Sequence, residues 1–358
     1  MIALNLAARF EDASAPPFVT RLTRDGAGGA CLAAEFGAAQ TYQLPGQAFQ
    51  IDVPEGDDLT GDVVFADPQN GRVSRWIRAT SPHNTLLVTE RCDQLCIMCS
   101  QPPKKSHTDL FAHLEAACRL APQDMVLGIS GGEPLLFKDQ VFTLIERIHA
   151  ARPDLGFHVL TNAQHFAEAD LDRLRQPALR KVLWGVPLYA ASAALHDEIV
   201  GKAGAQAQLL EGLAIMARAG LGIELRTVLL KQNYSPLPAL APLISARLPF
   251  IRVWAVMQLE RAGFARNRWH DQFVDHSGEP GALIEAVSLA SAAGIAVSLY
   301  NVPYCTVPAC LRPFLRQSIS DWKRTYAAEC LECSAKTICS GFFEWHAELS
   351  DYARGAPV

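Results

Sequence analysis

The chain has 358 residues, of which 49% are hydrophobic and 19% are charged. This composition excludes a largely disordered chain, and the length suffices for one barrel-sized domain with one or two small additions. The formal net charge of −5 argues against RNA or DNA as the main partner, because general nucleic-acid binders are usually basic.

The N-terminal stretch MIALNLAARFEDASAPPF carries acidic residues too early for a signal peptide. No stretch approaches the roughly 18 uninterrupted apolar residues of a membrane helix. We therefore expect a cytoplasmic protein with no membrane partner. Its ten cysteines should then be reduced, and clustered cysteines in that compartment are more often metal ligands or catalytic groups than disulfides. Three lie within 92–99 and five within 305–339, whereas Cys31 and Cys118 stand alone and are expected to be inert thiols.

Residues 1–80 read as a small β-rich domain without visible chemistry. Short strand-like runs, YQLPG and FQIDV, lie between glycine and proline residues. The stretch DVVFADPQNGRVSRWIR predicts a β-hairpin, with its turn at Asn70 and Gly71.

Strand-like and helix-like patterns alternate from about residue 83 onward. The helix-like patterns include one with Leu110, Leu114, Ala117 and Cys118 on one side, and one with Leu209, Leu213, Met216 and Ala217. The predicted strands are 85–89, 125–130, 157–161, 181–188, 222–230 and 251–257, with a weaker seventh at 295–299. This alternation predicts a parallel sheet, either open or closed into a barrel.

Three polar or cysteine-bearing segments follow the first three predicted strands. A loop with three cysteines follows the first strand, SGGEP (130–134) follows the second, and Thr161 and Asn162 end the third. Active sites of such folds lie at the carboxyl ends of the strands. The architecture should therefore bring these distant segments to one rim.

The first cysteine group has the spacing C-x3-C-x2-C, at Cys92, Cys96 and Cys99. Thiolates favour zinc, Cu(I) or iron–sulfur clusters, and a structural zinc site is closed by four ligands. A cubane cluster held by three thiolates leaves one iron without a protein ligand, so that a substrate or cofactor can bind there. The missing fourth cysteine therefore predicts a reactive cluster.

This arrangement resembles the radical S-adenosylmethionine (SAM) superfamily. The resemblance implies an α/β fold with a partial (β/α)6 TIM barrel over residues 81–294. It also implies a [4Fe-4S] cluster whose open iron binds SAM and splits it into a 5′-deoxyadenosyl radical that abstracts hydrogen from the substrate. The resemblance implies that the GGEP segment (Gly131, Gly132, Glu133 and Pro134) meets the ammonium of SAM through its backbone and the Glu133 carboxylate. It also implies that Met98 lies against the adenine, and that Asn162 and Arg226 contact the ribose and the carboxylate of SAM.

Each of these assignments has a simpler alternative. The cysteine triplet could be half of a zinc site, and GGEP could be an ordinary turn before a helix. Met98 could be a core residue, Asn162 a helix cap, and Arg226 a partner of Glu224.

The second cysteine group lies in the C-terminal third. Cys330, Cys333 and Cys339 form C-x2-C-x5-C, with Cys305 and Cys310 upstream. The pattern resembles the auxiliary-cluster (SPASM/twitch-like) domains of radical SAM peptide-modifying enzymes, and it implies one further [4Fe-4S] cluster in a domain over residues 295–358. We expect Cys305, Cys330, Cys333 and Cys339 as ligands, with Cys310 as the rival for Cys305. A structural zinc site is the alternative.

Several other stretches narrow the resemblance, namely NTLLVTERCDQLCIMCSQPPK, VPLYAASAALHDEIVG, GIELRTVLLKQN, RQSISDWKRTY and CSGFFEW. Together they resemble the His-Xaa-Ser system radical SAM maturase (HxsC type), over nearly the whole chain. The sequence departs from that family at Asp93, where many members have Asn, and at CSGFF, where a double glycine is commoner. Neither departure touches an expected ligand.

The resemblance implies an enzyme that modifies a ribosomally synthesised peptide of the His-Xaa-Ser repeat type, by hydrogen abstraction that installs a modification or a crosslink. The implied partners are that peptide, a second radical SAM maturase and a reductant such as flavodoxin or ferredoxin. Residues 1–80 either seat the peptide by edge-strand pairing or only cover the barrel. The alternatives are a radical SAM enzyme acting on tRNA or a small metabolite, and a non-catalytic zinc-stabilised binding protein.

Overall fold

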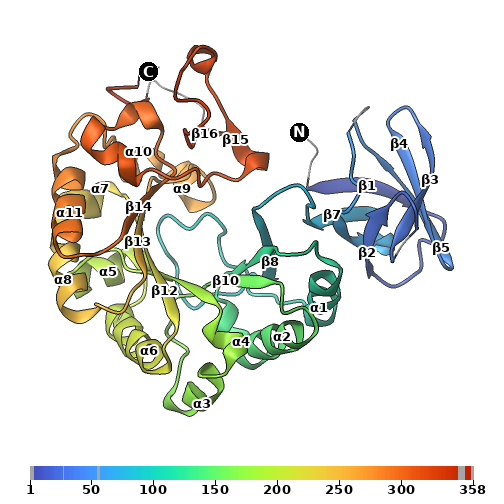
Figure 1. Ribbon diagram of the computed structural model, residues 1–358, viewed down its shortest axis with the longest axis horizontal. Helices are drawn as coiled ribbons and strands as arrows, with labels where there is room; N and C mark the ends of the chain where they lie inside the picture. The colour runs from blue at the N-terminus through green and yellow to red at the C-terminus, as the bar shows by residue number, and fades with distance from the viewer. Residues whose placement is uncertain (1–3, 27, 55–56, 346–350, 356–358) are drawn as a thin grey trace. The chain divides into compact units, whose positions relative to one another are not determined.

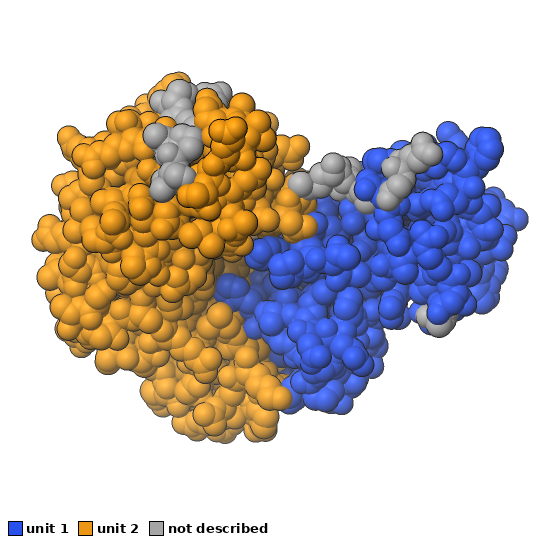
Figure 2. All heavy atoms as spheres, turned by 45° about the horizontal axis from the view of Figure 1, so that its top comes forward, with its two compact units in different colours: residues 1–89, 108–130, 137–158 blue, residues 90–107, 131–136, 159–358 orange. Residues whose placement is uncertain are grey.

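The computed structural model describes residues 4–26, 28–54, 57–345 and 351–355. The chain divides into two compact units, coloured separately in Figure 2. Unit 1 comprises residues 1–89, 108–130 and 137–158, and unit 2 comprises 90–107, 131–136 and 159–358. Among the described residues, no helix combines the length and apolarity needed to cross a lipid bilayer.

The first seven strands of unit 1 form a closed barrel in the order β1-β5-β4-β3-β2-β6-β7. Their bounds are β1 (Asn5–Phe10), β2 (Phe18–Thr23), β3 (Ala30–Phe36), β4 (Ala39–Leu44), β5 (Gln47–Asp52), β6 (Val63–Asp67) and β7 (Arg72–Ile77). The predicted hairpin is confirmed, because β6 and β7 pair antiparallel and Gly71 adopts a left-handed φ of 57° in the turn. The core contains Leu22, Phe49 and Ile51, each at most 1% exposed.

The rest of unit 1 begins the alternation of strands and helices. Its elements are β8 (Asn84–Thr89), α1 (Phe111–Leu120), β9 (Val126–Gly131), α2 (Lys138–Ala151) and β10 (Gly156–Leu160), of which Gly131 and the last two residues of β10 belong to unit 2. Helix α1 buries Leu114, Ala117 and Cys118, as its 3.6-residue spacing predicts.

Unit 2 continues with β11 (Leu183–Pro187), β12 (Gly222–Val228), β13 (Val253–Met257) and β14 (Val297–Tyr300). These four strands pair in parallel, and the sheet runs in the consecutive order β14-β13-β12-β11-β10-β9-β8. All seven strands predicted from the β-branched runs are present. The strands of unit 2 are nearly fully buried, as expected for a parallel sheet with both faces covered.

The helices of unit 2 connect these strands, and the longer ones lie along the outer side of its curved sheet (Figure 1). Their bounds are α3 (Leu171–Leu174), α4 (Pro177–Arg180), α5 (Ala193–Val200), α6 (Ala205–Ala219), α7 (Lys231–Tyr234), α8 (Leu240–Arg247), α9 (Phe264–Asn267), α10 (Trp269–Gln272) and α11 (Gly281–Ala292). Helix α6 buries Leu209, Leu213 and Met216, so its predicted apolar face is confirmed.

The last part of unit 2 consists mostly of single 3-10 turns. It also contains a short antiparallel pair, β15 (Arg324–Thr325) and β16 (Phe342–Phe343). The five C-terminal cysteines lie in this region. The division of the chain at residues 80 and 294 stays a prediction.

Two buried histidines of unit 2 are held without charge. Burial lowers the pKa of His196 and of His276 to about 4, against the opposing charges of Asp197 and Asp275. The Gln258 side-chain amide donates to Val274 O and lies 2.8 Å from His276 Nδ1, which leaves His276 Nε2 to donate to Thr306 Oγ1 at 2.9 Å. Both hydrogen bonds of His276 therefore suit the neutral ring.

Acidification from pH 6.5 to pH 4 is expected to lower the free energy of unfolding by about 3 kcal/mol for each of these histidines. Over this range the unfolded chain binds a proton at each histidine and the folded chain does not, so stability falls as the pH falls. Urea unfolding at a series of pH values measures the slope. The H276Q variant should lose stability less steeply than the wild type, and equal slopes would contradict this origin.

Candidate functional site

The three N-terminal cysteines lie on one loop of unit 2, the cysteine loop (residues 92–99), directly after β8. All three side chains are of intermediate exposure. Burial is the main cause that raises the pKa of Cys92 to about 11 and that of Cys96 to about 12, and the charge of Cys99 contributes to both shifts. The negative charges of the three thiolates would therefore repel one another, and a bound cation would relieve this repulsion.

The end of α5 holds the middle of the cysteine loop by its backbone. Leu95 N donates to Val200 O at 3.0 Å, and Ile97 N donates to Ile199 O at 2.9 Å. Gly201 has a φ of 64°, and a Cβ atom there would lie 2.8 Å from Leu95 O. A glycine is therefore required where the helix meets the loop.

The segment around α9 and α10 holds the end of the cysteine loop. Phe264 N donates to Cys99 O at 2.9 Å, and Gln272 Nε2 donates to Ile97 O at 2.7 Å. Gly263 has a φ of 54°, and a Cβ atom there would lie 2.2 Å from Cys99 O. Because segments from two distant parts of the chain fix its backbone, the loop is preorganised.

The glycine-rich segment 131–134 docks on the start of the cysteine loop. Glu133 N donates to Arg91 O at 2.8 Å. A Cβ atom at Gly132 would lie 2.2 Å from Arg91 O and 3.0 Å from Cys92 Cβ, so only glycine permits this approach. Gly131 ends β9, and Pro134 begins a short 3-10 turn (Pro134–Phe137). The structure thus brings two of the predicted motifs into direct contact.

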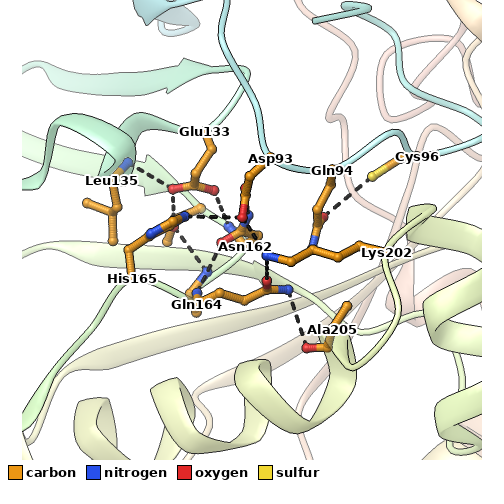
Figure 3. A network of polar contacts seen from close by, with 12 residues as sticks. Asp93, Gln94, Cys96, Glu133, Leu135, Asn162, Gln164, His165, Lys202 and Ala205 are labelled. Carbon is orange, nitrogen blue, oxygen red and sulfur yellow. Dashed lines mark hydrogen bonds and ion pairs between the residues drawn. The ribbon is translucent and has the colours of Figure 1, made fainter.

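The carboxylate of Glu133 is buried and accepts three hydrogen bonds (Figure 3). Its donors are Thr161 Oγ1 at 2.6 Å, Asn162 N at 2.6 Å and Leu135 N at 2.8 Å. Burial raises the pKa of Glu133, and these donors oppose that shift. Glu133 therefore also joins the end of β10 to the glycine-rich segment.

Asp93, the residue after Cys92, is the centre of a second polar network, the Asp93 anchor (Asp93, Asn162, Gln164, His165 and Lys202; Figure 3). Lys202 Nζ donates to Asp93 Oδ2 at 2.5 Å and to Gln164 Oε1 at 2.7 Å. Asn162 Nδ2 donates to Asp93 Oδ1 at 2.8 Å. The side chain predicted to contact a ribose therefore already binds the cysteine loop.

The other two residues predicted to contact SAM have close protein neighbours. Met98 is 6% exposed and packs in an apolar cluster with Leu259 and Trp269. Arg226 on β12 forms an ion pair with the buried Glu224, the pairing considered as its alternative. Their roles toward SAM stay predictions.

Four of the five C-terminal cysteines form one electrostatic group. Burial is the main cause that raises the pKa of Cys305 to about 11, and the charges of Cys339, Cys330 and Cys333 contribute to the shift. Tyr304 N and Gly341 N donate to Cys339 Sγ at 3.2 and 3.3 Å.

Backbone donors to sulfur, such as those at Cys339, are among the features that tune cluster thiolates. Cys310 is exposed, so the geometry favours Cys305 over its rival.

An aromatic cluster beside these cysteines encloses an ammonium group. Lys323 Nζ lies 5.7, 5.0 and 5.9 Å from the ring centroids of Trp322, Phe343 and Trp345. It also pairs with Glu260 Oε2 at 3.0 Å. This cluster joins two of the stretches that carry the narrower resemblance, RQSISDWKRTY and CSGFFEW.

The sequence assigns no general acid or base: it offers Glu260, Tyr189 and Cys310 as residues facing the cavity without ranking them. It gives no sign of Lys202 and His165. Tyr189 and Cys96 both pack against the apolar cluster around Met98. Glu260 forms an ion pair with Lys323. Lys202 and His165 carry no motif, since each follows an ordinary helix or strand end.

The donor sets suit a cluster in which each thiolate binds its own iron. Among the described residues, no three His, Cys, Asp or Glu side chains converge as ligands of one metal ion. The three thiols of the cysteine loop equal in number the protein ligands of an open cluster. That the C-terminal four bind a second cluster stays a prediction.

Residues 86–243 match the family model of the Radical SAM superfamily. The chain carries a radical SAM domain. The superfamily consists of enzymes, and the match covers the cysteine loop, the glycine-rich segment, Asn162 and Arg226.

Among curated proteins, the PqqA peptide cyclase of Granulibacter bethesdensis is 28% identical to this chain over 156 residues. The alignment covers 42% of this chain and 40% of the relative, so the match spans less than half of either protein.

Among solved structures, Streptococcus suis SuiB bound to S-adenosylmethionine gives a TM-score of 0.46 at 15% identity, over 60% of this chain and 49% of SuiB. A radical SAM methyltransferase from Sphaerobacter thermophilus gives 0.43 at 15% identity, over 74% of this chain and 73% of that protein. These likenesses do not extend to substrate or partner.

Proposed function

We propose that this protein is a radical SAM peptide maturase of the His-Xaa-Ser type. The observation that carries the radical SAM part is the docking of segment 131–134 on the cysteine loop, through Glu133 N and Arg91 O. The similarity to a peptide cyclase supports a peptide substrate, and the stretches now found around Lys323 support the narrower family.

In this proposal Cys92, Cys96 and Cys99 hold a [4Fe-4S] cluster. When bound, the cluster and SAM supply a 5′-deoxyadenosyl radical that abstracts hydrogen from the peptide. The chain's own residues provide the geometry: Gly132 permits close backbone approach, and Glu133 Oε2, which accepts from Asn162 N, has a second lone pair that can accept from the SAM ammonium.

Further contacts in this proposal are Met98 against the adenine, Asn162 at the ribose and Arg226 at the carboxylate. The electron comes from a flavodoxin or ferredoxin, and a second maturase acts beside this one. The seven strands of residues 1–80 close into a barrel, which leaves few free strand edges for pairing with the peptide.

Anaerobic incubation of the reconstituted protein with SAM and dithionite tests this function. The expected product is 5′-deoxyadenosine, together with a mass change in a coexpressed His-Xaa-Ser peptide. A mass change in a nucleoside or small metabolite instead would favour the other radical SAM reading. Colourless protein that binds zinc and releases no 5′-deoxyadenosine would support the binding-protein alternative.

The proposed auxiliary cluster makes a separate prediction about the two rival cysteines. C305A should lose about half of the iron and sulfide per chain, because four thiolates close the auxiliary cluster and each cubane holds about four irons. C310A should retain all of it, since Cys310 is exposed. Iron and sulfide analysis after anaerobic reconstitution measures the content of both variants. Loss in C310A with full content in C305A would assign the ligand to Cys310.

A further inference from the structure

The Asp93 anchor places a full ion pair beside an expected cluster ligand. Both carboxylate oxygens of Asp93 are engaged, Oδ1 by Asn162 and Oδ2 by Lys202, with His165 Nε2 3.5 Å from Oδ2. The Asp93 and Lys202 side chains are 24% and 25% exposed. Their interaction is therefore only partly screened by water.

Lys202 is fixed independently of Asp93. It follows Gly201, which abuts the cysteine loop, and its backbone N donates to Asp197 O at 3.1 Å. Its ammonium also donates to Gln164 Oε1. Lys202 is thus held beside Asp93 by the end of α5 and by the loop after β10, which limits how far the positive charge can move.

The charge of Asp93 lies next to an expected cluster ligand. Asp93 directly follows Cys92 in the cysteine loop, and hydrogen bonds from Asn162 and Lys202 hold its carboxylate in place. A negative potential at a cluster disfavours the addition of an electron, and net charge near the cluster is one of the factors that set its reduction potential. An unpaired carboxylate at position 93 would therefore make reduction harder.

We propose that Lys202 and Asp93 act as a charge-balanced positioning pair for the cluster held by Cys92. Asp93 ties the cysteine loop to the loop after β10, and Lys202 cancels the Asp93 charge that otherwise lowers the cluster's reduction potential. The inference rests on the proposed function, since it requires the open cluster. It assigns a role to Asp93, one of the two positions at which this sequence departs from the HxsC pattern, and it names Lys202 as the partner of Asp93.

The test is a double-mutant cycle on anaerobically reconstituted full-length protein. The midpoint potential is followed by electron paramagnetic resonance, using the cluster signal that changes when SAM is added. K202Q should shift the potential negative and D93N positive, and D93N/K202Q should return it toward the wild-type value. A merely structural role does not produce opposite shifts that cancel.

Two control variants separate the local charge from other effects. K202R keeps the charge and should keep the potential. R218Q removes an exposed positive charge at the C-terminal end of α6, just before β12 begins. This position lies at the edge of the sheet opposite to the carboxyl ends of the strands, so R218Q should leave the potential unchanged. If K202Q fails to fold, a positive shift of the potential in D93N together with an unchanged potential in K202R still tests the inference.

Single variants that retain the wild-type iron content and melting temperature but leave the potential unmoved, or move it in the same direction, overturn the inference alone. Wild-type protein that assembles no cluster overturns the proposed function and this inference together.

Discussion

C96A is expected to reduce 5′-deoxyadenosine formation by more than about 100-fold, because two thiolates do not hold the open cluster in place. Cys96 is the middle ligand of the proposed set, and burial together with the charges of Cys99 and Cys92 raises the pKa of its thiol to about 12. The backbone on both sides of it is fixed by Val200 and Ile199, so the loop should persist while the ligand is lost. Product release is measured by chromatography after anaerobic incubation with SAM and dithionite.

The matched control is C118A. Cys118 is fully buried on α1 in unit 1 and belongs to neither cysteine group. C118A should lose some stability through the small cavity it creates, and it should keep the wild-type iron content and product yield per folded chain. A C96A variant that cleaves SAM as well as C118A does would remove the three-cysteine site from the account.

G132A is expected to lower the free energy of unfolding by about 3 kcal/mol and to lower the iron content per chain. The added methyl group would lie 2.2 Å from Arg91 O, and that neighbour is backbone rather than the end of a flexible side chain. The chain can relieve the clash only by separating segment 131–134 from the cysteine loop, which breaks the hydrogen bond from Glu133 N to Arg91 O. Urea unfolding and iron analysis of the reconstituted protein measure the two effects.

G281A is the control for the loss of a glycine. A Cβ atom at Gly281, at the start of α11, meets nothing within 4 Å, and its φ lies outside the positive range. This substitution should leave stability unchanged or raise it by up to about 1 kcal/mol. If G132A matched G281A in both stability and iron content, the close docking of the two motifs would be wrong.

The sequence patterns predicted the sheet of the radical SAM domain well, because its strands are buried on both faces. Val253 to Met257, for example, is a β-branched and apolar run that only a covered strand or a short buried helix accommodates. The contact between segment 131–134 and the cysteine loop was predictable in outline, since the carboxyl ends of neighbouring parallel strands share one edge.

The polar anchors of the site were beyond sequence reasoning for a physical reason. Lys202 meets Asp93 across 109 positions of sequence, and Lys323 meets Glu260 across 63. A lysine at the end of a helix or in a turn is usually solvated, so no local pattern distinguishes these two. Only the folded chain shows that Asp93 has a cationic partner and that Trp322, Phe343 and Trp345 surround a single ammonium.

A diffraction experiment on anaerobically grown crystals at the iron absorption edge tests the central claim most directly. The account predicts anomalous density for a four-iron cluster at the cysteine loop, with Cys92, Cys96 and Cys99 as its only protein ligands and the fourth iron bound by added SAM. Density for one tetrahedral ion with four protein ligands at this position would contradict the account.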